Sequence, residues 1–113
     1  MRRYCLALDL KDDSALIAEY EDWHRKVYPE NEKNILDSGV INLEIYRVSN
    51  RMFMILEVDE SFTFERKAAM DAANQKVQEW EALMWRFQAP TPWTPAGTKW
   101  TPMQSIFRLS EAA

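Results

Sequence analysis

Alternating hydrophobic and polar positions predict a β-strand at the start of the chain. Over residues 3–10, every second side chain is hydrophobic, so the hydrophobic side chains share one face of the predicted strand. This two-residue period is typical of a half-buried strand. The period then changes to three and four residues over 13–27, where Asp12, Asp13 or Ser14 can cap the first turn. We therefore expect an amphipathic helix directly after the strand.

A proline and a glycine divide the chain beyond this helix. Pro29 is expected to end or kink it, and the segment after the proline is typical of one or two further helical turns that stop at Gly39. Two β-rich runs follow, over residues 40–48 and 51–59, with only a serine and an asparagine between them. This spacing predicts an antiparallel hairpin, whose two strands we expect at or near the centre of the sheet.

The second half of the chain shows the same change of period. Helical spacing returns over residues 61–88, and the segment 88–102 holds four of the five prolines, which predicts an irregular loop. Alternation over 103–109 then predicts a closing strand. The resulting β-α-β-β-α-β order is the ferredoxin-like pattern, an α+β fold in which helices cover one face of an antiparallel sheet.

A four-stranded sheet with helices on one face leaves its other face bare. In a chain of 113 residues that face has to be covered, and a second copy of the chain is the simplest cover, because twofold dimers are the commonest symmetric assembly. We therefore expect residues 1–113 to form one domain that assembles as a homodimeric α+β barrel.

Composition narrows the classes of function. A net charge of -4 without a basic cluster argues against nucleic-acid binding, and no apolar run approaches the roughly 20 residues of a membrane span. Asp9 and Asp12 interrupt the N-terminal segment before a signal-peptide core, so we expect a cytoplasmic protein. Cys5 has no second cysteine to pair with, and two glycines do not make a phosphate loop. We therefore expect neither a metal nor a cofactor.

One pair of residues could carry proton transfer. His24 is the only histidine, and its imidazole can accept or donate a proton near neutral pH. Tyr20 lies four residues earlier, so on a helix the two rings share the face that turns toward the sheet. The pair could be an active site or a hydrogen-bonded pair in the core, and the spacing alone does not decide.

Three tryptophans and a glutamate could surround such a site. Trp80 falls on the inward stripe of the second helical segment, where an indole could stack on a sugar or simply pack in the core. Glu81 could reach a pocket rim and accept sugar hydroxyls, or be a solvated helix residue. Trp93 and Trp100 lie in the proline-rich loop, where they could form a lid or anchor the loop on a partner subunit.

The order of these residues resembles the L-rhamnose mutarotase family along nearly the whole chain. The block 19–24 followed by 28–30 is similar to that family's tyrosine-x-x-x-histidine helix with its downstream proline and acid. Gly39, the stretch 78–80 and the ending 106–109 also fit. The resemblance implies a dimeric α+β barrel that interconverts the α and β anomers of a free sugar.

The resemblance also implies roles for individual residues. His24 would donate the proton that opens the sugar ring, Tyr20 or Glu81 would assist as base or orienter, and Trp80 would line the pocket. Glu81 stands where the rhamnose enzymes have a second tryptophan, and Leu43 stands where they have a tyrosine. Both departures look like the branch associated with L-fucose, so we expect a 6-deoxy-hexose substrate, with L-fucose favoured over L-rhamnose.

Two other functions remain open at this point. A cofactor-independent monooxygenase of the same barrel class would also use a buried tryptophan and histidine, and it would consume oxygen with a quinol-like substrate. A non-catalytic ligand-binding or dimerisation module would keep His24 as a core residue. Absence of a thermal shift with every monosaccharide would favour this last function.

Overall fold

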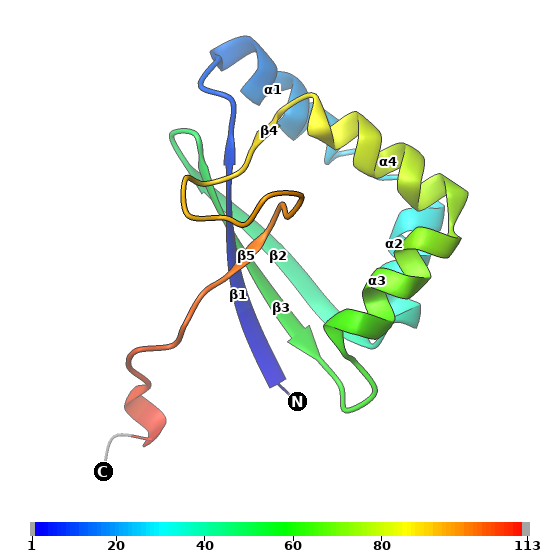
Figure 1. Ribbon diagram of the computed structural model, residues 1–113, viewed down its shortest axis with the longest axis vertical. Coiled ribbons are helices and arrows are strands. Elements are labelled where there is room, and N and C mark those ends of the chain that lie inside the picture. The colour runs from blue at the N-terminus through cyan, green and yellow to red at the C-terminus, as the bar shows by residue number, and fades with distance from the viewer. Residues whose placement is uncertain (1, 112–113) are drawn as a thin grey trace.

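The computed structural model describes residues 2–111 and contains one sheet with its helices along one side (Figure 1). The strands are β1 (Arg2–Leu10), β2 (Val40–Val48), β3 (Arg51–Val58), β4 (Gln88–Ala89) and β5 (Thr101–Pro102). The helices are α1 (Ser14–Trp23), α2 (Pro29–Asp37), α3 (Phe64–Ala73), α4 (Gln75–Trp85) and a short 3₁₀-helix, η1 (Leu109–Glu111).

All strand pairs of the sheet are antiparallel. The strands follow the order β2-β3-β1-β4, and β5 also pairs with β1, through Leu6 and Ala7. The α1–α2 pair connects β1 to β2, and the α3–α4 pair connects β3 to β4, so each predicted helical connection is present. The predicted α+β class and ferredoxin-like order are therefore confirmed.

Helix α1 begins where the sequence predicts and ends earlier. The Asp13 carboxylate accepts hydrogen bonds from the backbone N–H groups of Ala15 and Leu16, at 3.0 and 3.1 Å, and so caps the first turn. After Trp23, the backbone N–H groups of the next three residues donate to the carbonyl oxygens three residues earlier. This is the hydrogen-bond pattern of a 3₁₀ turn, so the α-helix has ended. The prediction that this helix reaches residue 27 is therefore wrong.

The predicted helix over 61–88 is two helices. Asn74 has extended backbone angles of φ -110° and ψ 109°, and it separates α3 from α4. Its side-chain oxygen accepts hydrogen bonds from the N–H groups of Lys76 and Val77, at 3.1 and 3.2 Å. Asparagine is a preferred N-cap residue, so Asn74 carried a signal for this boundary that hydrophobic spacing alone misses.

The hairpin of β2 and β3 forms as predicted, with a tight turn in which Ser49 takes a φ of 51°. Its strands occupy different places in the sheet, because β3 lies beside β1 whereas β2 lies at the edge. The expectation that both strands are central therefore holds for β3. Gly39, just before β2, has a φ of +101°, which confirms the left-handed position expected at the end of α2.

The hydrophobic core lies between the sheet and the helices. Leu6, Leu8 and Leu10 of β1 point to this side, and their cross-strand partners Met52 and Met54 on β3 are buried with them. From the helical side, the buried hydrophobic side chains are Tyr20, Val77, Trp80 and Met84, with Phe87 just after α4. The alternation that predicts β1 thus corresponds to real burial.

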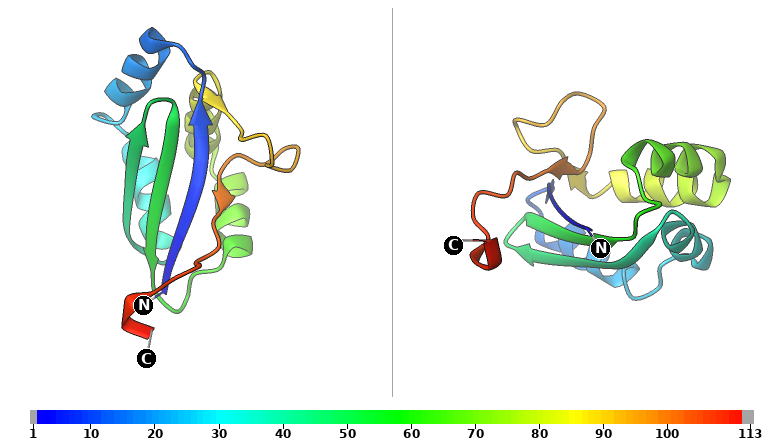
Figure 2. Two further views of the ribbon diagram at one scale, coloured as in Figure 1. Left: turned by 90° about the vertical axis from the view of Figure 1, so that its left-hand side faces the viewer. Right: turned by 90° about the horizontal axis from the view of Figure 1, so that it is seen from below.

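The other face of the sheet carries no helix (Figure 2). The predicted closing strand over 103–109 is wrong, because residues 103–108 form no strand. The segment pairs with β1 just before it, through Thr101–Pro102, and the Met103 N–H donates to the Cys5 carbonyl oxygen at 2.7 Å. The C-terminal segment leaves the body of the fold, and Ile106, Phe107 and Leu109 are largely exposed there. None of the helices between residues 2 and 111 is long and apolar enough to cross a membrane.

Candidate active site

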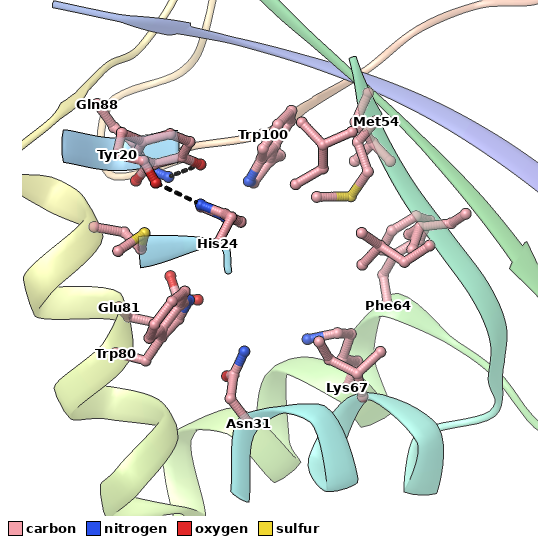
Figure 3. Close-up of a pocket in the computed structure, with 16 residues that line it drawn as sticks. Tyr20, His24, Asn31, Met54, Phe64, Lys67, Trp80, Glu81, Gln88 and Trp100 are labelled. Atoms are coloured by element: carbon pink, nitrogen blue, oxygen red, sulfur yellow. Dashed lines mark hydrogen bonds between the residues drawn. The ribbon is translucent and has the colours of Figure 1, made fainter. Parts of the chain in front are cut away.

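A cavity of about 290 Å³ lies between the inner face of the sheet and the helices (Figure 3). Its volume is at the lower end of the range for small-molecule sites, which suits a ligand the size of one monosaccharide ring. Both helical connections and the four strands β1, β2, β3 and β4 contribute to its wall. The residues that line it include the five at which the family resemblance implies a role or a difference in sugar choice: Tyr20, His24, Leu43, Trp80 and Glu81.

His24 is held in one orientation by the residue one helical turn before it. The imidazole Nδ1 lies 2.8 Å from the backbone carbonyl oxygen of Tyr20. A carbonyl oxygen only accepts hydrogen bonds, so Nδ1 must carry a hydrogen, and in the neutral ring Nε2 is then the basic nitrogen. The half-buried imidazole therefore keeps one nitrogen for chemistry while the other anchors the ring.

Tyr20 is buried and remains a neutral phenol. The pKa of Tyr20 is raised to about 12, chiefly by burial; a hydrogen bond from Gln88 opposes this shift, and the negative charge of Glu81 adds to it. The Gln88 amide donates to the phenol oxygen at 3.5 Å. Because this phenol keeps its proton near neutral pH, it is a poor general base but can still donate a hydrogen bond, so Tyr20 suits the orienter role rather than the base role.

Trp80 both packs in the core and lines the cavity. Its indole is 5% exposed and meets three aromatic rings edge-on. The centroid distances are 6.4 Å to Trp23, 5.7 Å to His24 and 5.1 Å to Tyr28. Edge-to-face contacts of this kind fix the plane of a ring. Trp80 therefore packs in the core and borders the cavity, and its stacking on a sugar stays a prediction.

Glu81 lies at the cavity, as expected, and has a partner that the sequence does not indicate. Its Oε2 accepts a hydrogen bond from the Lys99 Nζ at 2.7 Å. The two residues are 18 positions apart, and Lys99 belongs to the proline-rich loop. No local spacing rule joins a helix to a loop in this way.

The two loop tryptophans have different surroundings. Trp100 lines the cavity, in agreement with a lid position. Trp93 is 61% exposed and does not line the cavity; its ring lies 5.2 Å from the guanidinium carbon of Arg51. Leu43, on β2, pairs with Leu56 of β3 and forms part of the apolar wall.

Three polar residues of the cavity wall were missed by the sequence analysis. Asn31 is buried and lies four residues before Ile35, so helical spacing could have placed both on the inward face of α2. Lys67 binds Asp71 at 2.8 Å and carries no comparable signal. Gln88 is 5% exposed, and its Oε1 has no hydrogen-bond partner within residues 2–111.

Comparison with known proteins now identifies the family. The sequence model of the L-rhamnose mutarotase family matches residues 3–109. The chain belongs to this family. An L-fucose mutarotase of Xanthomonas campestris pv. campestris is 47% identical over 114 aligned residues, which cover 99% of this chain and 91% of the relative. The enzyme is therefore a sugar mutarotase, a carbohydrate isomerase.

Solved structures support the same fold at low sequence identity. An L-rhamnose mutarotase from Formosa agariphila superimposes with a TM-score of 0.69 at 18% identity, covering 96% of this chain and 99% of that one. Tetracenomycin F2 cyclase from Streptomyces glaucescens, a polyketide cyclase, superimposes with a TM-score of 0.55 at 15% identity, covering 96% of each chain. The mutarotase fold is thus shared with an enzyme of different chemistry.

Proposed function

We propose that this mutarotase interconverts the α and β anomers of L-fucose, with His24 as the proton-transfer residue. One observation carries the proposal: the imidazole is anchored through Nδ1 and borders a cavity of monosaccharide size. The 47% identity to an L-fucose mutarotase supports the choice of sugar.

Ring opening moves one proton between two oxygens of the sugar. The bond between C1 and the ring oxygen breaks, the anomeric hydroxyl loses its proton and becomes the aldehyde oxygen, and the ring oxygen gains a proton. Both oxygens are bonded to C1, so a single nitrogen can take the proton from one and give it to the other. In our proposal Nε2 of His24 does both, first as base and then as acid.

The open aldehyde then rotates about the C1–C2 bond and closes on its other face by the reverse proton transfers. The hydrogen bond from Nδ1 to the Tyr20 carbonyl can persist throughout, because Nδ1 carries a hydrogen in both the neutral and the protonated ring. The Tyr20 phenol, kept neutral by its raised pKa, donates a hydrogen bond that orients the sugar.

Glu81 supports L-fucose over L-rhamnose, two sugars that differ in configuration at C2 and C4. It offers a carboxylate that accepts sugar hydroxyls, where the rhamnose enzymes of the family have an aromatic side chain. Leu43 lines the cavity together with Ile45 and Met54, and this apolar wall suits the C6 methyl group that both 6-deoxy sugars carry.

The test is saturation-transfer NMR of anomer exchange on several sugars in parallel. We expect the fastest exchange with L-fucose, slower exchange with L-rhamnose, and little with D-galactose or D-ribose. L-galactose is the matched control, because it differs from L-fucose only by a hydroxyl on C6, which the apolar wall should disfavour. Exchange with L-rhamnose at the same rate as with L-fucose would refute the preference, and no exchange with any sugar would refute the function.

Two reciprocal substitutions sharpen this test. Leu43→Tyr and Glu81→Trp place the rhamnose-type side chains in the cavity, and the double variant should shift the ratio of rates toward L-rhamnose. An unchanged ratio would show that sugar choice lies elsewhere in the wall.

We also propose that the enzyme is a homodimer in which the helix-free face of the sheet is covered by a second copy. A second, largely apolar hollow lies on this face, and its lining residues include Tyr46, Val48, Phe53 and Met103. The exposed apolar side chains of the C-terminal segment supply complementary surface. Coverage by a second copy would bury both.

A further inference from the structure

We propose that Lys99 is a positioning residue of the mutarotase site, which fixes the Glu81 carboxylate and seats Trp100 against the cavity. The inference deepens the proposed function and rests on it, because it takes the cavity to be where the sugar binds.

The contacts of Lys99 are those of an ordered side chain. Its Nζ donates to Oε2 of Glu81 at 2.7 Å and to the backbone carbonyl oxygen of the same residue at 3.0 Å. The ammonium also lies 4.5 Å from the centroid of the Trp85 ring. Only 13% of the Lys99 side chain is exposed. All three contacts are made to α4, so this one side chain anchors the proline-rich loop to that helix.

The contacts between Lys99 and α4 matter for the cavity because of where Lys99 lies in the chain. Trp100 follows directly and lines the cavity wall, and the next residues form β5 on the edge of β1. Two residues before Lys99, Gly97 has a φ of +81°, and no atom lies within 4 Å of the position that a Cβ would take there. The loop is therefore loosely surrounded at Gly97 and anchored from Lys99 onward.

The Lys99–Glu81 contact also lies at the boundary of the cavity. An open hollow lined by α3, α4 and the proline-rich loop shares four lining residues with the cavity: Phe64, Lys67, Glu81 and Trp100. These shared residues border both spaces, and Figure 3 shows Glu81 and Trp100 at separate places on the cavity wall. By holding Oε2, Lys99 restricts the rotation of the carboxylate and presents Oε1 in a constant direction.

Loss of Lys99 should therefore affect sugar binding more than proton transfer. Glu81 and Trp100 would lose their fixed positions, while the His24–Tyr20 hydrogen bond on α1 is independent of the loop. The signature of a positioning role is thus a raised KM with a largely preserved kcat. A residue that mattered only for folding would lower the melting temperature without this split.

The experiment compares Lys99→Met, Lys99→Arg and Lys76→Met with the wild type. Lys76 is the matched control, because its Nζ pairs with Glu79 on the same helix at 3.8 Å, with 56% and 49% of the two side chains exposed. For Lys99→Met we expect an increase in the KM for L-fucose of about tenfold with kcat within about twofold, as for loss of uniform binding. Lys99→Arg should recover most of the affinity, and Lys76→Met should match the wild type. Lys99→Gln replaces Lys99→Met if the latter does not fold.

Hydrogen–deuterium exchange provides a readout that needs no activity. Backbone amides of residues 96–101 should exchange several-fold faster in Lys99→Met than in the wild type or in Lys76→Met. If the wild type exchanged the anomers of no sugar, the proposed function would fail, and the amide exchange would still decide whether Lys99 holds the loop. Wild-type KM in Lys99→Met, or wild-type amide exchange, would overturn the proposal.

Discussion

The Nδ1 atom of His24 lies 2.8 Å from the backbone carbonyl oxygen of Tyr20, and this contact determines which nitrogen can do chemistry. Since the carbonyl requires a hydrogen on Nδ1, the neutral imidazole has its lone pair on Nε2. The helix that carries Tyr20 thereby fixes the tautomer of the histidine that follows it.

His24→Asn should remove the nitrogen proposed to transfer the proton and keep the hydrogen bond to the Tyr20 carbonyl. The asparagine amide can donate to the Tyr20 carbonyl in place of Nδ1, but it has no basic atom at the position of Nε2. We expect a loss of about 10²- to 10⁴-fold in the rate of anomer exchange, the usual contribution of a positioned acid–base residue. Saturation-transfer NMR measures it, and a thermal shift with L-fucose serves as the control for binding. Activity within a few-fold of wild type would contradict the role of His24.

The raised pKa of Tyr20 predicts a loss of stability in alkaline solution. The unfolded chain loses the phenol proton above pH 10, whereas the folded chain keeps it to about pH 12. The folded state is then penalised relative to the unfolded state as the pH rises between these values. The wild type should lose roughly 1 kcal/mol more than Tyr20→Phe between pH 9 and pH 11. Urea unfolding measures both proteins, and equal losses would show that Tyr20 titrates normally.

Gly39→Ala should be strongly destabilising. A Cβ at this position would lie 2.6 Å from Oδ1 of Asp59 and 2.7 Å from Oγ of Ser61, on a backbone with a φ of +101°. The clash and the backbone strain together should cost about 2 to 4 kcal/mol. Gly97→Ala isolates the strain, because φ is +81° there and the space is open, and it should cost only about 1 kcal/mol. Equal effects in urea unfolding would contradict the packing argument.

The proposed homodimer predicts a mass of about twice 13.4 kDa by light scattering after size exclusion. Phe107→Asp places a charge on the exposed C-terminal segment and should shift the enzyme toward the monomer. Leu36→Asp is the control, because Leu36 is also exposed but lies on α2, away from the helix-free face. A monomeric wild type would refute the dimer.

Elements that follow from local periodicity were predictable from the sequence. The strand β1, the hairpin and the shared location of Tyr20 and His24 follow from spacings of two and four residues, because burial imposes those spacings. Helical spacing also placed Trp80 and Glu81 near a pocket, whereas the position of Leu43 was singled out by the family resemblance alone.

The remainder depends on contacts between distant parts of the chain. Residues 103–109 alternate as a strand would, yet 103–108 form none, because a strand needs a neighbouring edge to pair with and alternation does not specify one. The Lys99–Glu81 ion pair and the Gln88–Tyr20 hydrogen bond likewise join segments that only the folded chain brings together.

The three edge-on rings around Trp80 also bear on the thermodynamics of sugar binding. The Trp80 indole is already confined by Trp23, His24 and Tyr28, so it loses little rotational freedom when a ligand contacts its face. A flexible wall would lose conformational entropy when a ligand binds, whereas this wall has already lost it during folding. In the proposed complex, a small neutral sugar therefore needs few contacts.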